Sequence, residues 1–313
     1  MNSFAFVVNV ASLEADSFTL ASGQVLRRAQ EDEIAVIKAT IDRFNGGLHS
    51  FVGFSPWEGK LPFIAGRRIE SLPEPEWRYF VIAFEGSHET LIDIQQASDL
   101  SSTELEIGFA VLFTFPGSTG GFVFHPGRLF QALEDCNQAA YGLNLQALIH
   151  VSEAVAQDIA TLCVKLRSAD RRLIDVKALA SRIGDLKLLP SRSPLRFLGY
   201  FAILESVLSH PPKLSDPYDF IMRQVKTKIA FLNNRFDRKL DYSRFSGAPA
   251  ETIWTKMYTY RNLLAQGTMP TFDGELAILA SDAQALGLLK RTLKAILRQA
   301  LIEPQLLLDL KDC

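Results

Sequence analysis

Hydrophobic residues follow two different periods along this chain of 313 residues, and the change between them constrains the fold most strongly. Up to about residue 125, short runs rich in β-branched and aromatic residues alternate with turn residues, a pattern typical of strands. From Pro126 onward, apolar residues recur at helical spacing. The chain is also long enough for two domains. We therefore expect an α+β protein, with a strand-rich α+β domain at 1–140 and an all-α helical bundle at 141–313.

Five segments of the first half are expected to be strands, and one is expected to be a helix. The strands are predicted at 4–10, 18–21, 77–84, 104–115 and 121–125. The helix is predicted at 31–44, where apolar residues have helical spacing behind an acidic first turn. The Gly-rich stretch at 116–121 lacks the lysine and the spacing of a phosphate-binding loop, so we expect an interstrand turn there.

The second half is expected to form an antiparallel bundle of about four or five helices. They are predicted at 145–169, 193–210, 216–236, 247–267 and 282–301. The helix at 145–169 either belongs to the bundle or bridges both halves. Ser193 and Asp216 are expected to be N-caps, each followed by proline at the first helical position. Gly267 is expected to end its helix at the C′ position.

The charge of the chain is distributed unevenly. Residues 191–261 hold twelve Lys/Arg and six Asp/Glu, a local charge of +6. Because the whole chain carries −2, the remainder carries −8. A basic segment in an acidic protein indicates either a surface for a phosphate-bearing partner or simply solvated helix faces. Charge alone favours the solvated faces.

The residues that bind metals or form disulfides are scattered. Cys136, Cys163 and Cys313 show no CxxC spacing, and the five histidines (49, 88, 125, 150 and 210) form no pair with ligand spacing. We therefore expect no metal and no cofactor. The N-terminus has no basic region or cleavage site of a signal peptide, and the most apolar stretch, 107–115, is too short to span a bilayer. A cytoplasmic protein without a membrane partner is the expectation.

The helix expected to end at Gly267 places an arginine on a mostly apolar face. Trp254, Tyr258 and Arg261 fall near one face, because steps of four and three residues stay together on a helix. An unpaired buried arginine is costly. Arg261 therefore pairs with an acid on a neighbouring helix, with Glu205 the obvious partner, contacts a partner subunit, or lies in a cleft that accepts an anion. Taken alone, the pattern favours the structural alternatives.

The two segments RFLGYFAILESVLSH and IWTKMYTYRNLLAQG, in this order, resemble an early bundle helix and the motif helix of HEPN domains of the ApeA-like group. That family carries an arginine, usually a polar residue, and then, four to six residues on, a histidine that is often followed by glycine. Arg261, Asn262 and Gly267 match these positions, and the resemblance covers roughly residues 190–301. At the position of the histidine, this chain has Gln266.

The resemblance implies metal-independent RNA cleavage in which the ribose 2′-hydroxyl attacks the adjacent phosphate. Such chemistry needs a proton acceptor with a pKa near neutrality, which histidine supplies. It also needs a fixed cation for the charge that develops on phosphorus, which arginine supplies. Glutamine takes up no proton at pH 7, so the loss of the base predicts a rate about 10²–10⁴-fold lower. His210 is the nearest alternative base in the sequence.

The leading hypothesis is therefore a HEPN-like RNA-directed effector, similar to endoribonucleases of phage-defence and toxin systems, inactive or weakened as written. Arg261 would bind the scissile phosphate, Asn262 would orient it, Gln266 would occupy the base position, and Glu205 would position Arg261. RNA, a second copy of the chain, and a trigger or partner protein at the N-terminal domain are the expected partners. The chain is then either a natural non-catalytic member or an inactivated version of a toxic nuclease.

Two alternatives stay open. The same residues can hold a dimer interface in a non-catalytic RNA-binding or protein-interaction module. They can also form a buried Arg261–Glu205 pair in a purely structural bundle.

Overall fold

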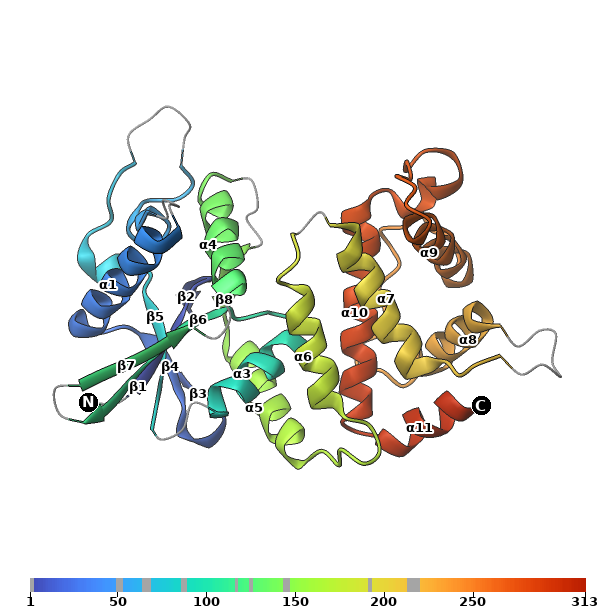
Figure 1. Ribbon diagram of the computed structural model, residues 1–313, viewed down its shortest axis with the longest axis horizontal. Coiled ribbons are helices and arrows are strands. Elements are labelled where there is room, and N and C mark those ends of the chain that lie inside the picture. Colours follow the sequence, from blue (N-terminus) through green and yellow to red (C-terminus); the bar gives the residue numbers. More distant parts are fainter. Residues whose placement is uncertain are drawn as a thin grey trace. The chain divides into compact units, whose positions relative to one another are not determined.

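The first half of the chain forms a six-stranded antiparallel sheet in the computed structural model of the protein (Figure 1). The structure describes residues 3–48, 53–63, 69–85, 89–115, 118–123, 126–142, 147–190, 193–212 and 220–313. In spatial order, the strands are β3 (Ser17–Thr19), β4 (Val25–Arg28), β5 (Phe80–Phe84), β1 (Ser3–Val7), β6 (Ile107–Phe115) and β7 (Ser118–Val123). The predicted α+β class, with strands first and helices after, is confirmed.

Strand β1 lies at the centre of this sheet, between β5 and β6. Phe4, Phe6 and Val8 alternate toward one face, where they join a core with residues of α1 (Glu31–Leu48), α2 (Ser55–Glu58) and α4 (Pro126–Ala140). The intervening Ala5 and Val7 are also fully buried, so the second face is covered as well. The predicted helix at 31–44 is α1. Helix α3 (Glu89–Leu100) and strand β4 were not predicted from the sequence.

The predicted helix at 145–169 is wrong at its start. Residues Ile149–Val151 form strand β8, and helix α5 begins only at Glu153 and ends at Ser168. Strand β8 pairs in parallel with β2 (Val10–Leu13), about 140 residues earlier in the chain. Non-local backbone pairing therefore overrides the local helical period in these three residues.

The chain divides into two compact units, Met1–Arg167 and Ser168–Cys313. This division falls at the last residue of α5, whereas the sequence places the domain boundary at residue 140. The physical reason is that α5 is tied to the first unit. The guanidinium of Arg167 pairs with Asp93 of α3, with Nε 2.8 Å from Oδ2, and the thiol of Cys163 lies 3.6 Å from the carbonyl oxygen of Asp93.

The longer elements of the second unit are all α-helices. These are α6 (Val176–Leu186), α7 (Pro194–Leu208), α8 (Ile221–Asn233), α9 (Ala250–Ala265), α10 (Asp282–Ala300) and α11 (Pro304–Asp312), with a 3-10 helix at Gly274–Leu279. Helix α7 packs against α6, α8, α9, α10 and α11, and Figure 1 shows it beside α10. The bundle is thus built around α7, which also carries Glu205.

Local signals predicted some of these helix ends, whereas helices α6 and α11 were not predicted from the sequence. Ser193 is the N-cap of α7 and Pro194 its first residue, although the Ser193 side chain makes no capping hydrogen bond. Helix α8 begins at Ile221 after an extended Phe220, and the expected cap Asp216 lies outside the described residues. In the described part of the chain, no helix combines the length and apolar composition needed to cross a membrane.

Candidate functional site

The motif helix α9 ends as the sequence predicts. Gly267 lies at C′ with φ +76°, a left-handed conformation that favours glycine. Its N–H donates to the carbonyl of Leu264 at 3.0 Å, and the Thr268 N–H donates to that of Leu263 at 3.0 Å. This pair of bonds is a Schellman motif, which satisfies carbonyls that a helix end otherwise leaves open. The position of Gln266 is therefore set by local backbone geometry.

Arg261 pairs with Glu205 across two helices, as expected from the sequence. Its Nη2 lies 3.3 Å from Glu205 Oε2, and its Nη1 donates to the side-chain oxygen of Asn262 at 3.1 Å. The side chains of Arg261 and Glu205 are 35% and 17% exposed. A long, partly exposed ion pair of this kind contributes only about 0–1 kcal/mol to stability. The pair orients the guanidinium more than it stabilises the bundle.

The guanidinium of Arg261 keeps donors that the described residues do not use. A guanidinium carries five N–H donors. Within the described part of the chain, one hydrogen bond goes to Glu205 and one goes to Asn262. The remaining donors of a half-exposed cation can bind a carboxylate or a phosphate from outside. Of the three alternatives left open by the sequence, the structure shows the pair with Glu205, and the binding of an anion by Arg261 stays a prediction.

Tyr258 completes this cluster, although sequence analysis placed it only on an apolar stripe. Its hydroxyl donates to Glu205 Oε1 at 3.1 Å, so Tyr258 and Arg261 take different oxygens of one carboxylate. Burial, together with the adjacent negative charge of Glu205, raises the pKa of the Tyr258 hydroxyl far above its usual value. The hydroxyl therefore remains a donor at neutral pH. The spacing of Tyr258 and Arg261, three residues apart on one helix, places the two side chains near each other, but no sequence signal indicates the contact with Glu205.

Gln266 is not part of this cluster. It is the exposed C-cap residue of α9, and its backbone N–H donates to the carbonyl of Asn262 at 3.0 Å. Five helical steps rotate a side chain by roughly 140° and advance it by about 7.5 Å. Gln266 and Arg261 of one copy therefore point in different directions. The structure brings together Arg261, Asn262 and Glu205 and leaves Gln266 apart.

The apolar stripe on α9 is covered within its own unit. Trp254 is 2% exposed and Tyr258 is 6% exposed. The Trp254 indole N–H is 3.1 Å from the Tyr242 hydroxyl, and the ring of Tyr258 packs edge-on against Phe201 with centroids 4.9 Å apart. This stripe therefore needs no partner subunit to cover it, and the homodimer stays a prediction.

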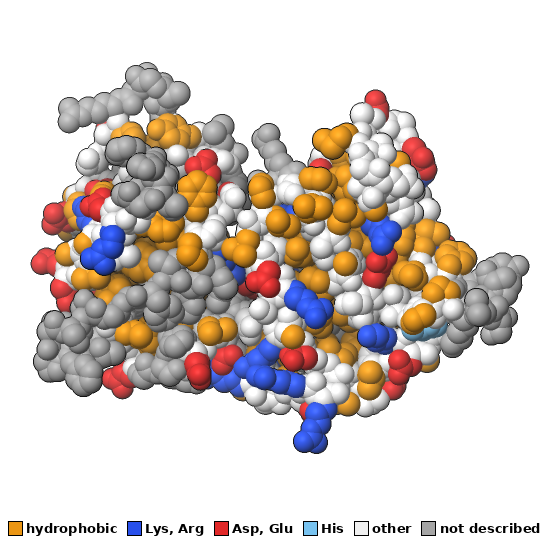
Figure 2. Space-filling model, viewed as in Figure 1, with side chains coloured by type: hydrophobic (Ala, Val, Ile, Leu, Met, Phe, Trp, Pro, Cys, Tyr) orange, Lys and Arg blue, Asp and Glu red, His pale blue; other side chains and the backbone are white. Residues whose placement is uncertain are grey.

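Several basic residues of the segment 191–261 are neutralised by nearby acids. Besides Arg261, the ion-paired side chains include Lys226, Arg235 and Lys256, whose partners are Glu251, Glu303 and Glu275. On the face drawn in Figure 2, Lys and Arg side chains lie among acidic ones. The α8–α9 loop differs, because Arg238, Lys239 and Arg244 are exposed there and make no ion pair with the described residues.

Two other features of the described residues are distinct from the motif. Asp99, Glu104 and Glu106 bring carboxylate oxygens within 4.8 Å of one another, the kind of donor set that binds cations. Here the guanidinium of Arg128 supplies the positive charge, with Nη2 2.7 Å from Asp99 Oδ1 and Nε 2.6 Å from Glu106 Oε2. The cluster is a buried ion-pair network.

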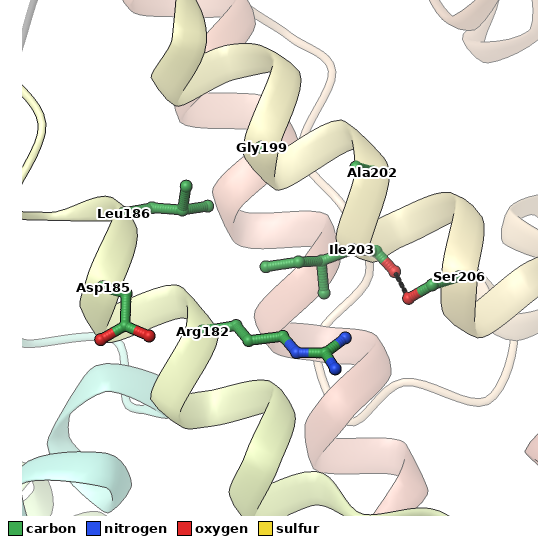
Figure 3. A pocket seen from close by; sticks show the side chains of 7 residues that line it. All are labelled: Arg182, Asp185, Leu186, Gly199, Ala202, Ile203 and Ser206. Atoms are coloured by element: carbon green, nitrogen blue, oxygen red, sulfur yellow. Dashed lines mark hydrogen bonds between the residues drawn. The ribbon is translucent and has the colours of Figure 1, made fainter.

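A groove of about 340 Å³ lies between α6 and α7 (Figure 3). Its lining is mainly apolar, and Gly199 allows the side chain of Leu186 to approach α7 closely. It is lined by Arg182, Asp185, Leu186, Gly199, Ala202, Ile203 and Ser206. None of the motif residues lines this groove.

The alternative base His210 lies just beyond the end of α7. Its ring Nδ1 is 2.8 Å from the carbonyl oxygen of Pro211, and its backbone N–H donates to Gln224 Oε1 at 3.0 Å. His49, His88 and His125 lie outside the described residues. In the first unit, His150 Nδ1 is 2.7 Å from the hydroxyl of Ser12 on the paired strand.

Comparison with known proteins found no match to this chain among protein-family models, curated proteins or solved structures.

Proposed function

We propose that the helical unit is an RNA-directed effector of the HEPN type, in which Arg261 receives a backbone phosphate and in which Gln266 leaves the cleavage step weakened. The observation that carries this proposal is the half-exposed guanidinium of Arg261. It is oriented by Glu205 and Asn262 and retains donors for an anion. A single RNA phosphate presents several oxygens to such a planar fork.

The proposed roles follow from the chemistry of transesterification. The 2′-hydroxyl would attack the adjacent phosphorus, its proton would pass to a base, and the bond to the 5′-oxygen would break as that oxygen gains a proton. Arg261 would stabilise the charge on the phosphorus oxygens. Glutamine at 266 can donate and accept hydrogen bonds, but it cannot hold the transferred proton at pH 7.

The proposal also includes a homodimer. Because Arg261 and Gln266 of one copy point in different directions on α9, a second motif helix would be needed to bring both residue types to one phosphate. Sedimentation at tens of micromolar should show a dimer. A chain that stays monomeric there would remove this part of the proposal.

The test is the substitution Gln266→His, assayed with total RNA in the presence of EDTA. We expect cleavage to rise by about 10²–10⁴-fold, with products that end in a 2′,3′-cyclic phosphate. The double variant Gln266→His with Arg261→Ala should lose this gain, because the base would remain without the cation. Both side chains are exposed enough for these changes to leave the fold intact. An intact RNA pool with a folded, dimeric Gln266→His protein would end the nuclease proposal.

The second candidate is a non-catalytic RNA-binding or protein-interaction module. It is favoured by one observation, that Gln266 is exposed at a helix end and apart from Arg261. In that case Gln266→His would bind RNA as the unchanged protein does and would not cleave it.

A further inference from the structure

The first turn of helix α7 carries an arginine that is buried without a counter-charge. Arg196 is 8% exposed, and its Nε is buried with no hydrogen-bond partner. Its side chain forms no ion pair with any residue that the structure describes. Arg128, which is buried to the same extent in the first unit, is neutralised by Asp99 and Glu106. Because a buried cation without a partner is costly, Arg196 lacks the compensation that Arg128 has.

The neighbouring sequence supplies no acid to Arg196. Residues 186–204 contain three Lys/Arg and no Asp/Glu. In the described part of the second unit, Lys187, Arg196 and Lys228 are at least nine-tenths buried, and no acidic side chain is buried to that extent. The interior of this unit therefore holds an excess of positive charge, which favours an anion.

The position of Arg196 on α7 adds a second source of positive potential. Helix α7 has 15 residues, and the N–H groups of a first turn carry partial positive charge and lack partners within the helix. The side chain of Ser193 makes no capping hydrogen bond, and the first turn contains no acidic residue. A helical side chain extends over the turn that precedes its own Cα. Arg196, the third residue of α7, is therefore directed toward this uncapped end.

We propose that the first turn of α7 is a binding site for a phosphate group, held by the guanidinium of Arg196 and by the N–H groups of that turn. A phosphate has enough oxygens to accept from both kinds of donor at once. Glu205, the partner of Arg261, lies nine residues further along α7, about 13 Å at 1.5 Å per residue. The site is thus separate from the motif, and it does not rest on the proposed function.

The first test measures thermal unfolding in inorganic phosphate, with ionic strength held constant by chloride. At a phosphate concentration ten times the dissociation constant, the unfolding equilibrium constant should fall by about tenfold. Arg196→Met keeps an apolar side chain of similar length and removes the charge, so it should abolish this response. Without phosphate, Arg196→Met should be at least as stable as the unchanged protein, because an unpaired buried charge is removed. Arg182→Met, at an exposed position of α6, is the matched control and should keep the full phosphate response.

A second pair of variants retains Arg196. Ser193→Asp places a carboxylate at the N-cap of α7, where it occupies the site proposed for the phosphate, so the phosphate response should be lost. Ser193→Asn caps a helix about as well but carries no charge, and it should keep a larger response. Equal phosphate responses in these two variants would count against a charged ligand at this turn.

The source of the phosphate is tested by competition with a single-stranded RNA oligonucleotide. If inorganic phosphate displaces the RNA from the unchanged protein more effectively than from Arg196→Met, the site takes an RNA phosphate. If phosphate stabilises the protein without displacing RNA, the ligand is a free phosphate or a small phosphate ester. A protein that responds to phosphate and binds no RNA would support this site and reject the RNA-directed function.

Three results would overturn the proposal. They are the absence of any stabilisation by phosphate, an unchanged response in folded Arg196→Met, and equal stabilisation by acetate, which would indicate a general effect of anions.

Discussion

Replacing Arg128 with methionine should destabilise the N-terminal unit more than any surface change. The guanidinium binds both oxygens of Asp99, at 2.7 and 3.0 Å, and Glu106 Oε2 at 2.6 Å. The side chains of Arg128 and Asp99 are only 7% and 2% exposed. Methionine fills a similar volume, but it leaves the carboxylates buried together without a cation. Breaking such a pair typically costs about 3–5 kcal/mol, a large share of the 5–15 kcal/mol that stabilises a typical domain.

Cys136 provides an assay within the same unit. Its thiol is fully buried on α4, the helix that also carries Arg128. Burial raises the pKa of this thiol far above its usual value, so it is protonated and inaccessible until the unit opens. Because about 1.4 kcal/mol changes an equilibrium constant tenfold, the predicted destabilisation should accelerate labelling of Cys136 by about 10²–10⁴-fold.

Lys60→Met is the control for this prediction. Lys60 and Glu70 form an ion pair in the same unit, but their side chains are 70% and 76% exposed, and the pair should contribute about 0–1 kcal/mol. If Arg128→Met labels at Cys136 as slowly as Lys60→Met, the argument that the buried pair is required for stability is wrong. Combining Arg128→Met with Asp99→Leu should recover part of the loss, since one uncompensated charge is removed.

Three further predictions concern other parts of the chain. Ala280, at φ +59°, occupies a left-handed region that disfavours side chains, so Ala280→Gly should raise the free energy of unfolding by about 0.5–1 kcal/mol in urea, whereas Ala283→Gly in the first turn of α10 should not. Burial raises the pKa of Cys136 above its ordinary 9.0 and that of Tyr79 above its ordinary 10.0, so the folded state keeps protons that the unfolded chain releases. The free energy of unfolding should therefore be constant below about pH 9 and should fall as pH rises further, by up to about 1.4 kcal/mol per pH unit and group. The free energy of unfolding of Cys136→Ala should fall less steeply over the same pH series. Replacing Arg238, Lys239 and Arg244 by glutamine should reduce the slope of log RNA affinity against log salt by about 0.7 for each lost phosphate contact. An unchanged slope in filter binding would show that these residues contact no RNA phosphate.

The parts of the fold that the sequence predicts are those governed by neighbouring residues. The start of α7 follows from Ser193 and Pro194, its end from Pro211, and the end of α9 from Gly267. Each of these signals acts within a few residues, through a fixed φ, a missing donor or a left-handed conformation. These local signals therefore do not depend on contacts with distant residues.

Features that depend on distant residues were missed or misplaced. Strand β8 was assigned to a helix because Ile149–Val151 fit a helical period, and only the parallel partner β2 makes them a strand. Strand β4 has four residues, and its pairing with β3 and β5 defines it. In the same way, the sequence places Tyr258 on a face of α9 but contains no local signal that its hydroxyl meets Glu205 on α7.

The same distinction separates the two halves of the motif. Arg261 is held by a tertiary contact with Glu205, whereas Gln266 is held by the hydrogen-bonded end of its own helix. A change at 266 therefore leaves the orientation of Arg261 intact, and the exposed position has room for an imidazole. A substitution at position 266 is accordingly expected to preserve both the fold and the Arg261–Glu205 pair. Under the proposed function, Gln266→His should therefore change the proton chemistry and little else, and the presence or absence of RNA cleavage by the folded, dimeric variant tests that proposal.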